Sequence, residues 1–212
     1  MSLVDSLNVG IVRPVAAKTG VSGIDKQPVA GPVSVRAPEP GGSGLAGDPI
    51  CDPAHHGGVD QAVYAYARED LDAWQSTLGD LRPGSFGENL TTRGVEVTGA
   101  RIGERWRVGD DLVLEVAVPR IPCRTFAAWL DVHGWVTTFT RAGVPGAYLR
   151  VLHPGLVRVG DPITVEHRPD HEITIGLTFR AITTEPDLLP RLLIADALPQ
   201  EVKDTAARRA PA

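Results

Sequence analysis

Short runs of alternating apolar and polar residues, bounded by glycine or proline, recur along most of the chain. Alternation with a period of two places the apolar side chains on one face of a sheet, so these runs predict strands. The predicted strands cover residues 6–12, 31–38, 61–67, 104–118, 146–152 and 161–167. The run 104–118 is predicted to be a hairpin that turns at Gly109 and Asp110, and residues 16–30 are expected to form an irregular connection.

Helical spacing of apolar residues appears in three other segments. It predicts a helix over residues 68–78 and one or two short helices over 124–143. Residues 186–210 are rich in leucine and alanine, with prolines at positions suited to first turns, which predicts a small helical module. We therefore expect a mainly β domain over 1–168 and a C-terminal α-helical module over 169–212.

Size and charge narrow the function classes. The chain has 212 residues, 42% of them apolar, and a formal net charge of −5. It is long enough for a sizeable core, and its charge does not suggest a broad surface for nucleic acid. No apolar run approaches the roughly 20 residues of a membrane helix, and the first residues do not resemble a secretion signal, so we expect a cytoplasmic protein.

One of the two cysteines lies in an unusual stretch, "VPRIPCRTF". Two prolines end the preceding strand and turn the chain before Cys123. Arg120 and Arg124 flank the thiol, and positive charge favours the thiolate, which is the form that attacks or binds metal. A cysteine packed as a small hydrophobe is the alternative interpretation. Cys51 and Cys123 could form one bridge, but a reducing compartment favours two thiols.

The stretch "CDPAHHGG" ends a long segment without periodicity, residues 37–60, and loops of that length are usually functional or disordered. Its cysteine, aspartate and histidines are candidate zinc ligands, although their spacing is poor for a structural site. Its glycines also suit a backbone cradle for an anion. A Cys–His hydrolase is a third hypothesis, with Cys123 as nucleophile and His55, His56 or His133 as base. The sequence has no Walker loop, dinucleotide fingerprint or H-E-x-x-H motif.

Five segments, in order along the chain, resemble the bacterial MOSC family, in particular its YiiM-like branch. They are "GIDKQPVAGPV", "HHGGVDQAVYAYAREDLDAW", "PGSFGENLTT", "RVGDDLVLEVAVPRIPC" and "GAYLRVLHPGLVRVGD". The family is named after the C-terminal domain of molybdenum cofactor sulfurases. The resemblance runs from about Asn8 to Glu166, and the tail from Ile173 resembles the three-helix module of that branch. It implies a β-barrel-like core with a few short helices.

The resemblance also implies chemistry. A cysteine matching Cys123 would ligate the molybdenum of a pterin cofactor (molybdopterin), and a thiolate is a suitable soft ligand. Relatives reduce N-hydroxylated compounds such as N-hydroxylaminopurines, which makes this chain an expected molybdenum-dependent oxidoreductase. A flavin-linked electron-donor protein is then implied as a partner, and a homodimer is a further expectation. The alternative is a carrier that holds sulfur as a Cys123 persulfide, or holds the cofactor, without turning over a small molecule. Pyridoxal phosphate binding is carried over only as a term of the wider family.

Further site residues follow from the same resemblance. Arg120 would meet the anionic cofactor, and the "HHGG" loop would line the pocket. Asn89 suits a pterin ring, although capping a turn is an equal role for it. Ala54 stands where relatives often carry a basic residue. The complete set of expected cofactor-binding residues is Arg120, His56, Gly57, Gly58, Asn89, Lys26 and Arg36.

Overall fold

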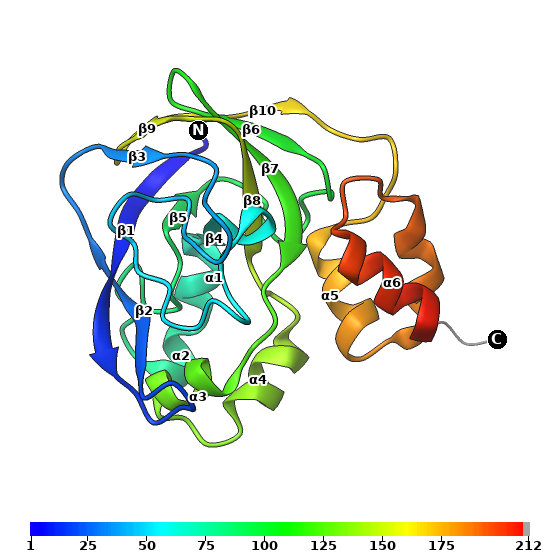
Figure 1. Ribbon diagram of the computed structural model, residues 1–212, viewed down its shortest axis with the longest axis horizontal. Helices are drawn as coiled ribbons and strands as arrows, with labels where there is room; N and C mark the ends of the chain where they lie inside the picture. The colour runs from blue at the N-terminus through cyan, green and yellow to red at the C-terminus, as the bar shows by residue number, and fades with distance from the viewer. Residues whose placement is uncertain (210–212) are drawn as a thin grey trace.

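The computed structural model describes residues 1–209 and contains one large sheet with helices at one end and one side (Figure 1). The strands of the large sheet are β1 (Leu3–Pro14), β2 (Val21–Pro28), β4 (Val63–Ala67), β5 (Leu90–Arg93), β6 (Arg105–Val108), β7 (Leu112–Pro119), β8 (Ala147–His153) and β10 (Ile163–His167). A second, two-stranded sheet pairs β3 (Val33–Val35) with β9 (Gly155–Val157). The helices are the 3-10 helices η1 (Val59–Gln61) and η2 (Pro186–Ile194), and α1 (Arg68–Ala73), α2 (Gln75–Leu78), α3 (Arg124–Leu130), α4 (Trp135–Ala142), α5 (Ile175–Thr183) and α6 (Gln200–Arg209).

The eight-stranded sheet is mixed and open. Its strand order is β10-β6-β7-β8-β4-β5-β1-β2, and only the β4–β5 pair is parallel. An isolated bridge joins Leu3 to Pro162, so the start of β1 approaches the start of β10. The outer strands β10 and β2 do not pair with each other, however, and four of the five residues of β10 are exposed. The barrel-like description therefore needs correction, because a barrel requires the two edges to close.

Most predicted strands are confirmed, including the hairpin, in which Val108 of β6 lies opposite Leu112 of β7. The irregular connection predicted over residues 16–30 is wrong, because those residues contain β2. The reason is that β2 does not alternate. Asp25 and Lys26 are both buried and satisfied by polar partners, and the ladder to β1 holds the strand extended. β5 was also not predicted, because it lies in a segment rich in turn residues.

Aromatic side chains fix the helices beside the end of β7. Phe86 lies within 5.2 Å of the Phe126 ring and 5.6 Å of the Trp135 ring, centroid to centroid. Trp74 and Phe139 complete the same buried cluster. Edge-to-face contacts of this kind each contribute about 0.5–1.5 kcal/mol beyond burial. Since Phe126 belongs to the first turn of α3, the cluster holds this turn in place directly after Cys123.

The C-terminal segment is helical as predicted. It consists of α5, η2 and α6, and Pro190 within η2 prevents a regular α-helix there. Figure 1 shows this module beside β7, and the backbone N–H of Ile175 donates to the Ala100 carbonyl (2.9 Å). Most of its buried apolar residues join one cluster with those of the sheet, and Phe179 joins the aromatic cluster. A boundary at 168/169 stays a prediction, and residues 210–212 lie outside the described residues.

Candidate functional site

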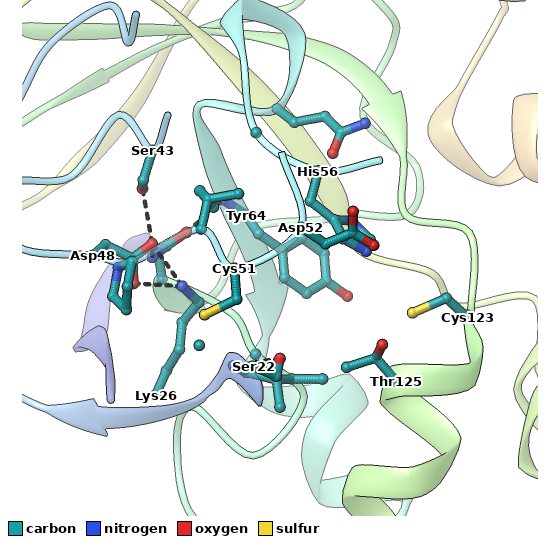
Figure 2. A pocket seen from close by; sticks show the side chains of 18 of the residues that line it. Ser22, Lys26, Ser43, Asp48, Cys51, Asp52, His56, Tyr64, Cys123 and Thr125 are labelled. Atoms are coloured by element: carbon teal, nitrogen blue, oxygen red, sulfur yellow. Dashed lines mark hydrogen bonds and ion pairs between the residues drawn. The ribbon is translucent and has the colours of Figure 1, made fainter. Parts of the chain in front are cut away.

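A pocket opens where β2, the 43–57 loop, β4 and the β7–α3 junction meet (Figure 2). It contains about 720 Å³ of space, part of it open to solvent. Both cysteines line it. Of the expected site residues, it brings together Lys26, His56, Gly57, Asn89, Arg120 and Cys123.

Cys123 is presented by a turn between β7 and α3. β7 ends at Pro119, Pro122 is buried, and Cys123 has extended backbone angles (φ −125°, ψ 172°) immediately before α3 begins. The backbone N–H of Ala127 donates to the Cys123 carbonyl (3.1 Å). Figure 2 shows the sulfur pointing into the pocket. The two prolines therefore end the strand and aim the thiol, as the sequence predicted.

The surroundings of the thiol favour the thiolate. Burial raises the pKa of Cys123, but hydrogen bonding from the His56 imidazole and the positive charge of Arg120 outweigh burial and lower that pKa to about 6. At neutral pH most of the sulfur is then charged, which is the nucleophilic and metal-binding form. These contacts favour a functional thiol over an inert packed one.

Arg120 is a cation buried against aromatic rings. It is 6% exposed, and its guanidinium carbon lies 3.8 Å from the centroid of Phe126 and 5.2 Å from that of Tyr64. It donates to the backbone carbonyl of Phe86. Among residues 1–209 it forms no ion pair. Stacking on aromatic faces lowers the free-energy cost of burying the guanidinium, and its charge stays available to an anion in the pocket.

Lys26 and Asn89 belong to a buried network around Asp48. Lys26 Nζ lies 2.6 Å from both carboxylate oxygens of Asp48. Asn89 Nδ2 donates to Asp48 Oδ2 (3.0 Å), and its Oδ1 accepts from the backbone N–H of Tyr64 (3.1 Å). Both residues line the pocket, but their polar groups are already paired within the protein. The network holds the 43–57 loop against the sheet.

The "HHGG" loop contributes less than expected. His56 and Gly57 line the pocket, but a Cβ on Gly57 would lie 2.7 Å from the Gly42 carbonyl oxygen, so its glycine serves backbone packing rather than an open cradle. Gly58 is outside the lining, and its N–H donates to the same carbonyl (2.9 Å). Arg36 is exposed directly after β3 and also lies outside the pocket lining.

The zinc hypothesis loses its support, because residues 1–209 contain no group of three or more His, Cys, Asp or Glu residues that could hold a metal ion. His55 instead contacts Asp52 (3.1 Å), and His133 is exposed outside the pocket. Within the described chain Cys51 and Cys123 are both free thiols. The sequence analysis considered Cys51 only as a zinc ligand or bridge partner, and no pattern predicted that Asp48, Thr125 and Tyr148 would line the same pocket.

Comparison with known proteins identifies the family, because the MOSC domain matches residues 52–164, just over half of the chain. This chain belongs to the MOSC domain family. YflK of Bacillus subtilis (strain 168) is 34% identical over 135 residues, which are 63% of this chain and 61% of that protein. A protein of Gibberella moniliformis (strain M3125 / FGSC 7600) named Reductase is 32% identical over 154 residues, which are 70% of this chain and 26% of that protein. This chain therefore aligns with less than two thirds of either relative.

The crystal structure of YiiM from Geobacillus stearothermophilus superposes with a TM-score of 0.80 at 25% identity, covering 100% of both chains. The chain is thus a YiiM-like MOSC protein, as its sequence predicted. No helix within residues 1–209 is long and apolar enough to cross a membrane. The comparisons give no support to pyridoxal phosphate binding, and the lysine in the pocket, Lys26, is held by Asp48.

MOSC domains are associated with the molybdenum cofactor. The pocket offers the Cys123 thiolate and a second sulfur at Cys51, and residues 1–209 contain no group of three or more ligand residues. Such a donor set suits a metal whose other ligands belong to a bound organic group. Arg120 supplies a buried positive charge for an anionic group. The residues present therefore fit a metal–pterin cofactor.

Proposed function

We propose that this protein is a molybdenum-pterin-dependent reductase of N-hydroxylated compounds such as N-hydroxylaminopurines. The observation that carries the proposal is the Cys123 thiolate, aimed into a pocket beside a buried cation that has no carboxylate partner within residues 1–209. The relative named Reductase supports an oxidoreductase. Membership of the MOSC family supports the cofactor.

Three residues of the pocket would have different roles in this reaction. Cys123 Sγ would hold the metal, and Arg120 would attract the anionic part of the cofactor and keep the sulfur deprotonated. His56, next to the sulfur, would hold a proton at its imidazole close to the reacting group. When bound, the cofactor supplies two-electron redox chemistry.

The overall reaction balances with two electrons and two protons. The N–O bond of the hydroxylamine breaks and the two electrons reduce the nitrogen, which keeps its hydrogen and takes one proton to become the amine, while the hydroxyl oxygen takes the other proton and leaves as water. The electrons would come from a flavin-linked donor protein, which this proposal includes as a partner. A homodimer is part of the same proposal.

Metal and pterin content test this function directly. The protein is purified from a host that makes the molybdenum pterin, and bound molybdenum, bound pterin and reduction of N6-hydroxylaminopurine with a chemical donor are measured. We expect all three in the wild type and in Cys51→Ser, and loss of metal and of reduction in Cys123→Ser. Cys51→Ser is the matched control because both thiols line the pocket.

Two results would count against the reductase. A wild-type protein without metal or pterin from such a host would remove its basis. A protein that carries both but reduces no N-hydroxylated compound would support the carrier, with Cys123 as the residue that holds sulfur or cofactor.

A further inference from the structure

A second cavity adjoins the pocket at Cys123. The two cavities share Asp52, His56, Cys123 and Thr125. Figure 2 shows Asp52 and His56 on the loop across the pocket from Cys123 and Thr125. We call the pocket described above the inner pocket and the second one the outer cavity. A molecule in the outer cavity can therefore approach Cys123 without entering the inner pocket.

The outer cavity combines apolar walls with positive charge. Ala16, Ala17, Ile121 and Pro122 form apolar parts of its lining, and the side chain of Ile121 is exposed there. Lys18 and Arg124 also line it, and both are exposed. Apolar walls suit the faces of a planar heterocycle, and the two cations suit an anionic group attached to it.

The two cations of the outer cavity are not neutralised within the described chain. Neither Lys18 nor Arg124 forms an ion pair among residues 1–209. Asp52 is the carboxylate of the lining, and it already contacts His55 Nδ1 (3.1 Å). Two cations thus face one shared carboxylate, in a chain whose net charge is −5. This local excess of positive charge runs against the charge of the whole protein and selects anions.

We propose that the outer cavity binds the phosphate of an N-hydroxylated nucleoside 5′-monophosphate, so that nucleotides are better substrates than free bases. This inference rests on the proposed reductase function. Lys18 and Arg124 would hold the phosphate, and Ile121 and Pro122 would contact the base or sugar. The N-hydroxyl group would then point toward the position of a metal on Cys123.

The binding step can be tested without cofactor. In cofactor-free Cys51→Ser protein, iodoacetamide alkylates Cys123, and the rate is measured at pH 7 with AMP, adenosine or inorganic phosphate added. We expect AMP to slow alkylation about tenfold at saturation and adenosine to slow it much less at the same concentration. The effect of AMP should weaken at high salt, because the cations are exposed.

Variants locate the effect in the outer cavity. The double variant Lys18→Ala/Arg124→Ala should lose the protection by AMP. The matched control is Arg141→Ala/Arg158→Ala, which removes two exposed cations outside both cavities and should keep it. Protection that survives in Lys18→Ala/Arg124→Ala, or an equal effect of adenosine, would overturn the inference.

Turnover by the loaded enzyme separates this inference from the proposed function. With dithionite as donor, we expect kcat/KM for N6-hydroxy-AMP to exceed that for N6-hydroxylaminopurine about tenfold, and the preference to vanish in Lys18→Ala/Arg124→Ala. Reduction of neither compound would refute the reductase while leaving the AMP protection intact. Equal kcat/KM values would refute the nucleotide preference alone. A loss of pterin in the double variant would assign the two cations to the cofactor and also overturn the inference.

Discussion

Lys26 and Arg120 are two cations buried to the same extent in one pocket, each with 6% of its surface exposed. Lys26 places its ammonium between both oxygens of Asp48, at 2.6 Å from each. Arg120 instead lies over two aromatic rings and donates to a backbone carbonyl. The two cations are therefore equally buried, but Asp48 neutralises the charge of Lys26, whereas the charge of Arg120 stays available to a bound anion.

The difference follows from the chemistry of the two groups. An ammonium is a compact, strongly hydrated charge that needs a carboxylate when it leaves water, whereas a guanidinium is delocalised and can rest on aromatic faces. Asp48 also accepts from the backbone N–H of Gly10 (2.7 Å) and from Ser43 Oγ (2.8 Å). Lys26 thus holds the 43–57 loop against the sheet through Asp48, whereas the charge of Arg120 lowers the pKa of Cys123. The following predictions test this division, from the largest expected effect to the smallest.

Replacing Asp48 should break the Lys26 side of the comparison. Asp48→Ala leaves a buried ammonium without its counter-charge and removes the acceptor for Gly10, Ser43 and Asn89. Loss of one partner of a buried pair costs about 3–5 kcal/mol, so urea unfolding should show a decrease of that size. Glu172→Ala removes an exposed pair with Arg191 and should change stability by less than about 1 kcal/mol. A similar loss in both variants would contradict the structural role of Asp48.

Replacing Lys26 should cost less, because Asp48 keeps its three neutral donors. Lys26→Met should lower the free energy of unfolding by about 1.5–3 kcal/mol, the size of a hydrogen bond to a charged group. The alkylation rate of Cys123 should stay close to that of the wild type, since Lys26 is not among the groups that set the pKa of Cys123. A large fall in alkylation would show that Lys26 also serves the thiol.

Replacing Arg120 should affect reactivity directly. Arg120→Gln removes a charge that lowers the pKa of Cys123, so less of the sulfur is thiolate at pH 7. Because the pKa starts at about 6, a rise of about one unit would slow iodoacetamide alkylation about twofold at pH 7 and up to about tenfold at pH 5. Arg124→Gln is the control, because Arg124 is exposed and does not set that pKa. Equal rates in wild type and Arg120→Gln would remove Arg120 from the account of the thiol.

The pH dependence gives the smallest effect. In Cys51→Ser protein without cofactor, alkylation should rise with pH around a midpoint near 6, the lowered pKa of Cys123. Because the folded pKa lies below the unfolded one, the thiolate stabilises the fold fully above the unfolded pKa of about 8.5, and that contribution disappears as the pH falls through about 6. The difference in unfolding free energy from Cys123→Ser should therefore widen between these pH values. A midpoint above 8 would contradict the influence of His56 and Arg120.

Much of the fold was predictable from local pattern. The sequence predicted the β6–β7 hairpin, β4 and the helices after Cys123. In these elements the spacing of the apolar side chains, together with the turn residues, is enough to identify a strand or a helix. β2 was not predictable, since its buried positions are polar and only their distant partners explain the burial. The expected closure of the sheet into a barrel was also wrong. Closure depends on whether the outer strands β10 and β2 pair with each other, and such long-range pairing leaves no local pattern.

The candidate site likewise has some features that the sequence predicts and others that only the tertiary structure determines. The sequence by itself determined that a strand ends at two prolines and delivers Cys123 next to Arg120, because proline acts on its own backbone and its neighbours. It also determined the family, through motifs in order. Only the tertiary structure decided that Lys26 is neutralised by Asp48, that Arg120 is not, and that two cavities meet at Cys123. Charge pairing and cavity walls join residues far apart in the chain, so no local pattern specifies them.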